Sequence, residues 1–452
     1  MAPFRHHLLV CTQEKPDGVP ACSASGGKAL LDAFRARIDT KGVGDEVLLT
    51  PCGCLGLCER GPNVVAYPEG RWHTSVQPDD VDAILEDLLS DGSGSHRPEP
   101  DDETIRREVS AHHKKVRAMT AARAKAGVVP DELMTLVRGF QPARAVLTAV
   151  ELDLFTHVGE RATAAQVAEK AGSDPRATAS LLNVLVAFGL LRRAGESFCL
   201  TDLSTAYLTA RSPHDARAAL MHSAHLWSSW STLTDCVRTG STLRSEPAAQ
   251  GDDRWTQAFI AAMHKIGSMR APVVASAIDF AGVTRVLDLG GGSGAYSIAI
   301  ARARADVHCT VFDLPAVLPL TRSYVTAAGM ADRIDFVAGD LHTDAYGSGF
   351  DLVFISAICH MMGPEENQAM LRKVFDALRP GGHVVIQDYI LNDDGTGYPT
   401  ATLFSLNMLV GTRNGSSYSE REYVAWLNQT GFTSPHAVKL PGPTGLVVAT
   451  RT

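Results

Sequence analysis

Short apolar runs alternate with longer amphipathic segments through residues 251–452. The apolar runs have the length of buried strands and predict them at 285–289, 308–312, 334–337, 352–355, 383–388 and 445–449. The amphipathic segments between them predict helices, and this alternation is typical of a mainly parallel sheet covered on both faces. We therefore predict an α/β domain over this part of the chain.

Residues 129–250 have a helical pattern instead. Apolar periodicity predicts helices at 163–171 and 174–188, and residues 190–200 predict a hairpin. A helix–turn–helix followed by a hairpin is a winged-helix layout, which raises DNA binding as one interpretation. Arg176 is the only basic residue of the second helix, however. We therefore favour a packing or dimerisation role.

The first 90 residues have the pattern of a small α/β module. A helix is predicted at 27–38, and strands are predicted at 7–11, 47–50, 64–67 and 71–75. A segment rich in Gly, Ser, Pro and Asp follows and predicts a linker, which we place at 91–128 and which contains a charged helical stretch at 104–125.

Composition narrows the class of protein. Of the 452 residues, 45% are hydrophobic and 20% are charged, as in folded globular proteins. The net charge of −8 disfavours nucleic-acid binding. No apolar run reaches the roughly 18–20 residues that cross a bilayer, and the amino terminus lacks a secretory pattern. We expect a cytoplasmic protein without membrane or nucleic-acid partners.

Cysteines are concentrated near the amino terminus, which predicts a metal site. The candidate ligands are Cys11, Cys22, Cys54 and Cys58, because iron–sulfur clusters are held by four thiolates. Zinc and unliganded buried cysteines are the alternatives. Zinc sites usually contain two short Cys-x2-Cys-type pairs, and this segment has a single short pair.

The cysteine segment resembles the thioredoxin-like [2Fe–2S] ferredoxins. The resemblance is carried by Cys-Leu-Gly-x-Cys-x-x-Gly-Pro at 54–62 and by Tyr-Pro-Glu-Gly-Arg-Trp at 67–72. It implies that residues 1–90 form a thioredoxin-like domain in which Cys54 and Cys58, completed by Cys11 and Cys22, hold a [2Fe–2S] cluster. Such a domain either serves a redox partner protein or is a vestigial scaffold. Cys52 departs from the family pattern as a fifth thiol.

A glycine-rich turn follows the strand at 285–289, with Gly290 and Gly292 placed to let the backbone approach a nucleotide-like ligand. Asp313 ends the next strand and would accept hydrogen bonds from ribose hydroxyls. Asp340 ends the third strand and would accept from an adenine amino group, with Leu341 packing beside it.

Together these strand ends resemble the S-adenosylmethionine-dependent methyltransferases, and Tyr296 and Ser297 stand where a dinucleotide site would have its third glycine. The resemblance implies that residues 251–452 form a Rossmann-like class I methyltransferase domain. Asp288 would orient the loop or meet the methionine ammonium, and Ser356 belongs to the same cofactor site.

His360 follows the fourth predicted strand and Asp388 closes the fifth, so both should lie at the carboxyl edge of the sheet. Asp388 would accept a hydrogen bond from the imidazole and fix its tautomer, leaving His360 as a general base. A phenol with a pKa near 10 needs such a base at neutral pH, whereas methyl transfer itself needs no metal.

The segment Ile358-Cys-His360 and the spacing to Asp388 resemble the small-molecule O-methyltransferases that include caffeic acid and hydroxyindole methyltransferases. The resemblance covers residues 131–452 and implies a homodimer that methylates a hydroxyl of an aromatic or polyketide-like molecule, with His360 and Asp388 as the catalytic pair. Met361-Met362 and Ser417 depart from the family pattern. Candidate pocket residues are Trp227, Trp230, Phe259, Met263, Phe404, Asn407 and Met408.

Two alternatives remain open. A carbon methyltransferase, or a hydroxylase or decarboxylase that takes electrons from the cluster, would keep the fold and change the reaction. A redox-sensing regulator with a DNA-binding winged helix belongs to another class, and the acidic charge opposes it.

Overall fold

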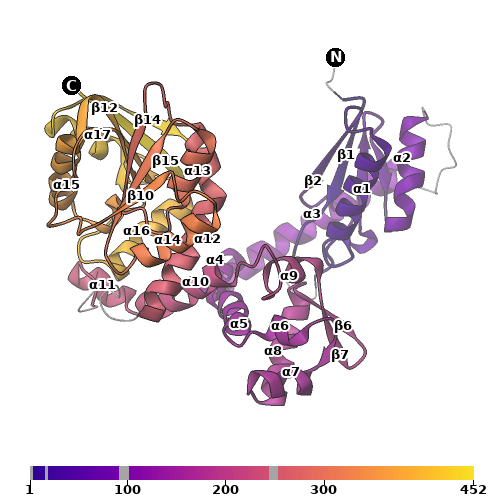
Figure 1. Ribbon diagram of the computed structural model, residues 1–452. Coiled ribbons are helices and arrows are strands. Elements are labelled where there is room, and N and C mark those ends of the chain that lie inside the picture. The colour runs from indigo at the N-terminus through magenta and orange to yellow at the C-terminus, as the bar shows by residue number, and fades with distance from the viewer. Residues whose placement is uncertain (1–3, 16–18, 91–100, 244–252) are drawn as a thin grey trace. The chain divides into compact units, whose positions relative to one another are not determined.

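The structure is a computed structural model that describes residues 4–15, 19–90, 101–243 and 253–452. The chain divides into two compact units, residues 1–139 and 140–452, which we call the first and the second unit (Figure 1). Among the helices of the described ranges, none is both long enough and apolar enough to span a membrane.

The first unit contains a four-stranded sheet in the order β2-β1-β3-β4. Its strands are β1 (His6–Cys11), β2 (Val47–Cys52), β3 (Val64–Tyr67) and β4 (Arg71–His73). β2 is parallel to β1, whereas β3 and β4 add antiparallel neighbours. The four predicted strands are confirmed, although β4 is shorter than expected.

Helices α1 (Gly27–Lys41) and α2 (Val81–Leu89) pack on this sheet and share its apolar core. A single-turn helix, η2 (Pro78–Asp80), precedes α2. The predicted helix at 27–38 runs one turn further, to Lys41, where Gly42 with φ 67° ends it.

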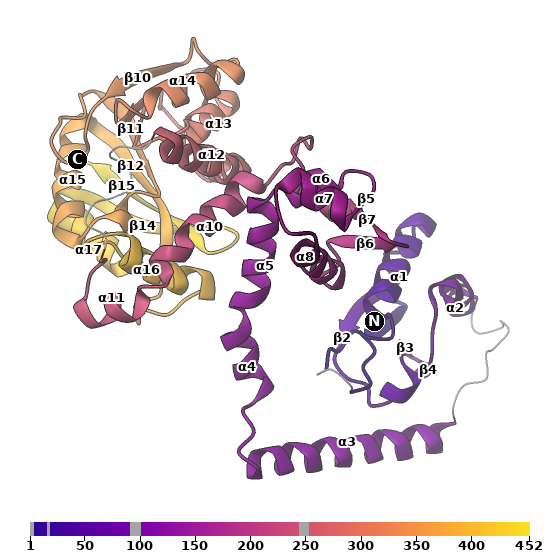
Figure 2. The ribbon, with the colours of Figure 1, turned by 90° about the horizontal axis from the view of Figure 1, so that it is seen from below.

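The charged stretch after the predicted linker forms a long helix, α3 (Asp102–Lys125), which Figure 2 shows in full. Ile105, near the start of α3, is buried. The methyl groups of Val109 lie so close to Gly56 that a Cβ added to this glycine would be 3.1 Å from one of them. The predicted flexible segment at 91–100 lies outside the described residues. The short helix α4 (Asp131–Arg138) ends the first unit.

The second unit begins with a helical part that contains a small sheet in the order β5-β7-β6. Its elements are α5 (Phe140–Glu151), α6 (Leu154–Val158), β5 (Ala162–Thr163), α7 (Ala164–Ala171), α8 (Pro175–Ala187), β6 (Leu191–Ala194), β7 (Ser197–Leu200) and α9 (Asp202–Tyr207). Thr163 and Asp174 cap α7 and α8 by accepting backbone hydrogen bonds. The predicted pair of helices and the hairpin after it are therefore present.

Three helices lead into the larger sheet, namely α10 (Arg217–Trp230), α11 (Leu233–Thr239) and α12 (Asp253–Ser276). The sheet has eight strands, seven of them in the order β10-β9-β8-β11-β12-β15-β14, with β13 paired to β12. They are β8 (Arg285–Leu289), β9 (His308–Asp313), β10 (Ile334–Ala338), β11 (Phe350–Ser356), β12 (Leu378–Leu391), β13 (Tyr418–Ser419), β14 (Phe432–Lys439) and β15 (Thr444–Arg451). Five neighbouring strands, β10, β9, β8, β11 and β12, are parallel, which confirms the predicted mainly parallel sheet.

Helices cover both faces of this sheet (Figure 1). The helices that follow its strands are α13 (Ala295–Ala303), α14 (Leu318–Ala327), α15 (Pro364–Ala377), α16 (Pro399–Gly411) and α17 (Glu420–Gln429). One core lies under α15 and α17, and a second core lies under α12, α13 and α14. Because both faces are covered, the carboxyl edge of the parallel strands is where such folds bind ligands.

Three strands of the sheet differ from prediction. β12 is longer than the expected strand at 383–388, and neither the two-residue β13 nor β14 was predicted. β14 is an edge strand that contains Pro435 and has an irregular register between Thr433 and His436. Edge strands tolerate proline and polar residues, so their sequence lacks the apolar run that marks a buried strand.

Candidate functional site

The glycine-rich turn at the end of β8 is tied to the end of β9. Gly290 and Gly292 have φ values of 68° and 55°, which favour glycine, and a Cβ on Gly290 would come within 2.5 Å of Ile358. The Gly292 amide donates a 2.7 Å hydrogen bond to Oδ2 of Asp313. The turn is therefore held at the carboxyl edge by a carboxylate from the neighbouring strand.

Asp313 keeps acceptor capacity beyond these backbone contacts. Its Oδ1 accepts from the Leu314 amide at 2.7 Å, and each carboxylate oxygen has a further lone pair for a ligand. Burial raises the pKa of Asp313, and the amides of Gly292 and Leu314 oppose that shift.

The structure places Asp340 and Leu341 in the turn after β10. Asp340 Oδ1 accepts from the His342 amide at 2.8 Å, and the Leu341 carbonyl accepts from the Tyr346 hydroxyl at 2.6 Å. A Cβ on Gly290 would lie 3.6 Å from the Leu341 side chain, so Leu341 borders the glycine turn.

Asp288 is buried beneath the turn, with an exposed fraction of 1%. Ser297 donates to its Oδ2 at 2.6 Å, whereas its Oδ1 is buried and has no hydrogen-bond partner among the described residues. Burial raises the pKa of Asp288 to about 6. A buried acceptor without a donor is rare in folded proteins and indicates a missing ligand group or water.

Ser356 ends β11, beside the same edge. Its hydroxyl donates to Oε1 of Gln387 at 2.6 Å, and the Tyr296 hydroxyl reaches the same oxygen at 3.4 Å. These three side chains therefore connect the end of β11 to β12 and to the helix that follows the glycine turn.

The predicted His360–Asp388 contact is present. His360 lies in a single turn of helix, η3 (Cys359–Met361), and its Nδ1 is 2.7 Å from Oδ1 of Asp388, while its amide donates to Oδ2 at 3.2 Å. Both side chains are buried, with exposed fractions of 6% and 2%. A carboxylate can only accept, so this contact places the proton on Nδ1 and leaves the Nε2 lone pair free to accept.

Ala357, at φ 57°, makes the sharp exit from β11 that brings η3 to the end of β12. A residue with a side chain rarely adopts this conformation, and such residues gather at functional sites. The sequence carried no signal for this turn, because alanine is not the residue expected there.

Four candidate pocket residues lie on or against α16, and one of them, Phe404, contacts His360. The Phe404 ring lies edge-on to His360 with centroids 4.7 Å apart, and it stacks on Tyr389 at 4.1 Å. Trp230 donates to the Asn407 side chain at 3.0 Å, and Met408 is buried nearby on α16.

The other candidates have different neighbours. The Arg144 guanidinium lies 5.5 Å from the Trp227 ring centroid, Phe259 contacts the His222 ring, and Met263 is half-buried on α12.

The family departures also have defined positions. Met361 is 49% exposed beside His360, whereas Met362 is buried. Ser417 is buried and its hydroxyl donates to the Ala401 carbonyl at 3.3 Å.

Sequence reasoning missed His264 of α12. Its Nδ1 lies 2.9 Å from the hydroxyl of Ser293 in the glycine turn, and its ring stacks on Tyr324 with centroids 3.9 Å apart. Only the packing of α12 against the turn brings His264 to Ser293, so no local pattern could have indicated the contact.

In the first unit, the four candidate thiols lie in two pairs. Cys11 and Cys22 are buried, and a hydrogen bond from the Cys22 thiol lowers the pKa of Cys11 to about 6. The sulfurs of Cys54 and Cys58 are 3.2 Å apart. All four are free thiols, so none is consumed by a disulfide.

Cys52 is the backbone neighbour of Cys11 across β1 and β2. Burial, with a smaller effect of the adjacent Cys11 and Cys54, raises the pKa of Cys52 to about 11.

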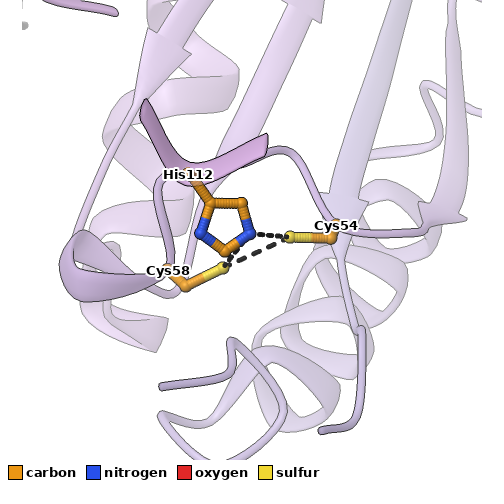
Figure 3. A group of neighbouring side chains, drawn as sticks. All are labelled: Cys54, Cys58 and His112. Atoms are coloured by element: carbon orange, nitrogen blue, oxygen red, sulfur yellow. Dashed lines mark hydrogen bonds between the residues drawn. The ribbon is translucent and has the colours of Figure 1, made fainter. Parts of the chain in front are cut away.

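A histidine outside the predicted domain completes this group. His112 of α3 places its Nε2 3.6 Å from the Cys54 sulfur and 3.9 Å from the Cys58 sulfur (Figure 3). Lys15 places its Nζ 2.9 Å from the Cys58 sulfur. His112 lies more than fifty residues beyond the cysteines in a charged segment, so nothing in the sequence linked it to them.

Comparison with protein families gives two matches. Residues 134–210 match an O-methyltransferase dimerisation domain, and residues 230–433 match an O-methyltransferase domain. Both matches begin after the cysteine-containing segment.

Individual relatives agree with these matches. The chain is 30% identical over 328 residues to the tetracenomycin polyketide synthesis 8-O-methyl transferase of Streptomyces glaucescens, covering 71% of this chain and 96% of that one. It is 31% identical over 330 residues to the 3-hydroxy-5-methyl-1-naphthoate 3-O-methyltransferase of Streptomyces sahachiroi, covering 71% and 95%. The crystal structure of human N-acetylserotonin methyltransferase in complex with S-adenosylmethionine has a TM-score of 0.65 at 25% identity, covering 71% and 97%.

Proposed function

The chain belongs to the O-methyltransferase family and is an S-adenosylmethionine-dependent O-methyltransferase, and from this premise we propose that it methylates a hydroxyl of an aromatic or polyketide-like small molecule. The two Streptomyces relatives are named for polyketide and naphthoate methylation, which supports this class of acceptor. The observation that carries the proposal is the 2.7 Å contact between His360 and Asp388 beside the glycine turn.

His360 is the proposed general base. Its Nε2 takes the proton of the acceptor hydroxyl during attack, while Asp388 stabilises the positive charge that develops on the ring. When bound, S-adenosylmethionine supplies a methyl group on an already activated sulfonium. The protein therefore needs to align the two molecules and to remove one proton. Asp388 acts through His360 and is a positioning residue.

We assign the cofactor to the carboxyl edge. Asp313 accepts from the ribose hydroxyls, Asp340 accepts from the adenine amino group, and Leu341 packs beside it. The Gly290 and Gly292 backbone allows close approach, and Ser356 lies at the end of β11. The unpartnered Oδ1 of Asp288 supports this placement, because an ammonium group would satisfy it directly or through water.

The acceptor proposal is tested by product mass. The full chain is incubated with S-adenosylmethionine and a panel of phenols, and each product is analysed by mass spectrometry and by nuclear magnetic resonance, which shows whether the new methyl group is on oxygen or on carbon. A gain of one CH2 on oxygen supports the proposal. A gain of CH2 on carbon, or a gain of oxygen, rejects it in favour of the two same-fold alternatives.

For the first unit we propose a thioredoxin-like domain at residues 1–90 that holds a [2Fe–2S] cluster through Cys11, Cys22, Cys54 and Cys58. The donor set fits this group: two pairs of free thiols, three of them buried, match a cluster with two ligands on each iron. A Cβ on Gly61 would come within 2.9 Å of the Cys22 sulfur, so this glycine keeps space at the thiols. When bound, the cluster supplies one-electron transfer.

The cluster proposal has its own test, which is independent of methyl transfer. Anaerobically purified chain is analysed for iron and acid-labile sulfide, and its ultraviolet–visible spectrum is recorded. Equal amounts of iron and sulfide, two of each per chain, support the proposal. Zinc without sulfide rejects it.

We further propose that residues 129–250 form a dimerisation domain through which two chains make a homodimer. Residues 251–452 then form the methyltransferase domain. The family match to a dimerisation domain supports this assembly. Leu136 and Val137 of α4, inside that match, are 79% and 58% exposed, and a large apolar side chain in water favours association. We also propose that the protein is cytoplasmic and that the cluster exchanges electrons with a redox partner protein. Residues 91–128 are proposed as the linker between the first two domains.

A further inference from the structure

The Cys54–Cys58 pair has two nitrogen neighbours that the cluster proposal leaves unexplained. His112 Nε2 is within hydrogen-bonding distance of both sulfurs (Figure 3). Lys15 Nζ lies 2.9 Å from the Cys58 sulfur and 3.4 Å from Nε2 of His112. The Cys11–Cys22 pair has a different neighbour, the Asn63 side chain, which donates to Cys22 at 3.4 Å. The two thiol pairs therefore have different electrostatic surroundings.

His112 is held in place by the rest of α3. Arg60, two residues after Cys58, forms a two-pronged ion pair with Glu108 at 3.0 and 2.8 Å. Val109 packs on Gly56, which lies between the two cysteines. Glu108 and Val109 precede His112 by one helical turn, so these contacts place its ring over the cysteine loop.

We propose that His112 and Lys15 donate hydrogen bonds to the sulfurs of Cys54 and Cys58 and thereby raise the reduction potential of the cluster. The inference rests on the proposed [2Fe–2S] cluster. With two thiolates and two sulfides on each iron, coordination is complete without the imidazole, which leaves His112 as a donor. His112 lies on α3, outside the proposed ferredoxin-like domain at residues 1–90, and acts on the cluster through the sulfurs of its cysteine ligands.

The sign follows from charge. Reduction adds one electron and converts one ferric ion to ferrous, so the reduced cluster carries one more negative charge than the oxidised cluster. Donors and cations beside the sulfurs stabilise the more negative state, and hydrogen bonds to sulfur are an established control of cluster potentials. Removing either donor should therefore make the cluster harder to reduce.

The test measures the midpoint potential of the full chain by titration with dithionite, followed by visible absorption and electron paramagnetic resonance. We expect His112→Phe and Lys15→Met each to shift the reduced-to-oxidised ratio at a fixed potential about threefold to tenfold toward oxidised. A tenfold change corresponds to about 59 mV for one electron. His113→Phe and Lys28→Met are matched controls that should leave the potential unchanged. His113 is the exposed residue next to His112 in sequence, and Lys28 is an exposed lysine that pairs with Glu14.

A second variant separates donation from packing. His112→Gln keeps an N–H at the end of a flexible side chain and should restore most of the potential lost in His112→Phe. Labelling the histidines with nitrogen-15 should give a weak coupling in pulsed electron paramagnetic resonance that disappears in His112→Phe and persists in His113→Phe.

The outcomes are distinguishable. Wild-type chain without equal iron and sulfide rejects the cluster itself. A cluster of normal composition whose potential is unchanged in both His112→Phe and Lys15→Met rejects the inference alone. Loss of the cluster in His112→Phe, with a strong nitrogen coupling in the wild type, would make His112 a ligand and would also overturn the donor role.

Discussion

The two units build their sites from different materials. In the second unit, strand ends and backbone hydrogen bonds hold the site, as when the Gly292 amide binds Asp313 and the His360 amide binds Asp388. In the first unit, the cysteine sulfurs contact one another and the side-chain nitrogens of His112, Lys15 and Asn63. The sheet-edge site is thus preformed, whereas the cysteine site depends on the group that its thiols bind.

The sharpest test of the preformed site is His360→Ala. We expect kcat for methyl transfer to fall about 10²–10⁴-fold, the usual contribution of a general base, with little change in S-adenosylmethionine affinity. His308→Ala is the matched control, since His308 begins β9 at the opposite edge of the sheet and pairs with Asp335 on the surface. Activity that survived in His360→Ala would remove the base assignment.

Asp313→Ala should have the next largest effect. It removes a charged acceptor from the ribose and frees the Gly292 amide, so we expect S-adenosylmethionine to bind roughly 10- to 100-fold more weakly. Isothermal calorimetry measures this directly. Asp335→Ala, one strand away and exposed, should bind normally, and equal affinities in the two variants would place the cofactor elsewhere.

We expect the free energy of unfolding of the ligand-free protein to depend on pH because of Asp288. Burial raises its pKa to about 6, so the folded state holds the proton more tightly than the unfolded chain does. The free energy of unfolding should therefore fall as pH rises through this range, by roughly 1 kcal/mol between pH 5 and pH 7 from this group. Urea unfolding of Asp288→Asn should lack that component, and parallel pH profiles for variant and wild type would contradict the assignment.

The double variant of Cys54 and Cys58 tests whether the cysteine site and the methyltransferase site are independent, and it has the smallest expected effect on methyl transfer. Cys54→Ser with Cys58→Ser should abolish cluster binding and leave methyl transfer within about twofold, because each unit has its own apolar core. Iron analysis and the methyl-transfer assay are run on the same preparation. A large loss of methyl transfer in the folded double variant would mean that the cysteine site acts on the reaction.

The local sequence predicted a helix or strand correctly where the residues of that element alone have the pattern that marks it. β8 was predicted with its observed bounds, and Thr163 and Asp174 sit at the starts of their helices as capping residues should. Asp313 ends β9 as predicted, whereas Asp388 does not end β12, which continues to Leu391. Asp388 follows the last β12 residue that pairs with β11, so it still lies at the carboxyl edge of the parallel strands. β14 escaped prediction because an edge strand needs no apolar run.

The order of residues alone therefore determined the buried parallel strands, the turn glycines and the pairing of His360 with Asp388, since each follows from short-range periodicity and from the rule that parallel strands share an edge. Tertiary structure alone decided that His112 reaches the cysteine pair and that His264 contacts Ser293. It also decided that one oxygen of Asp288 is buried without a donor from the part of the chain that the structure describes. These contacts depend on how helices pack against distant loops. That packing is set by the fit of many side chains at once, and no local pattern encodes it.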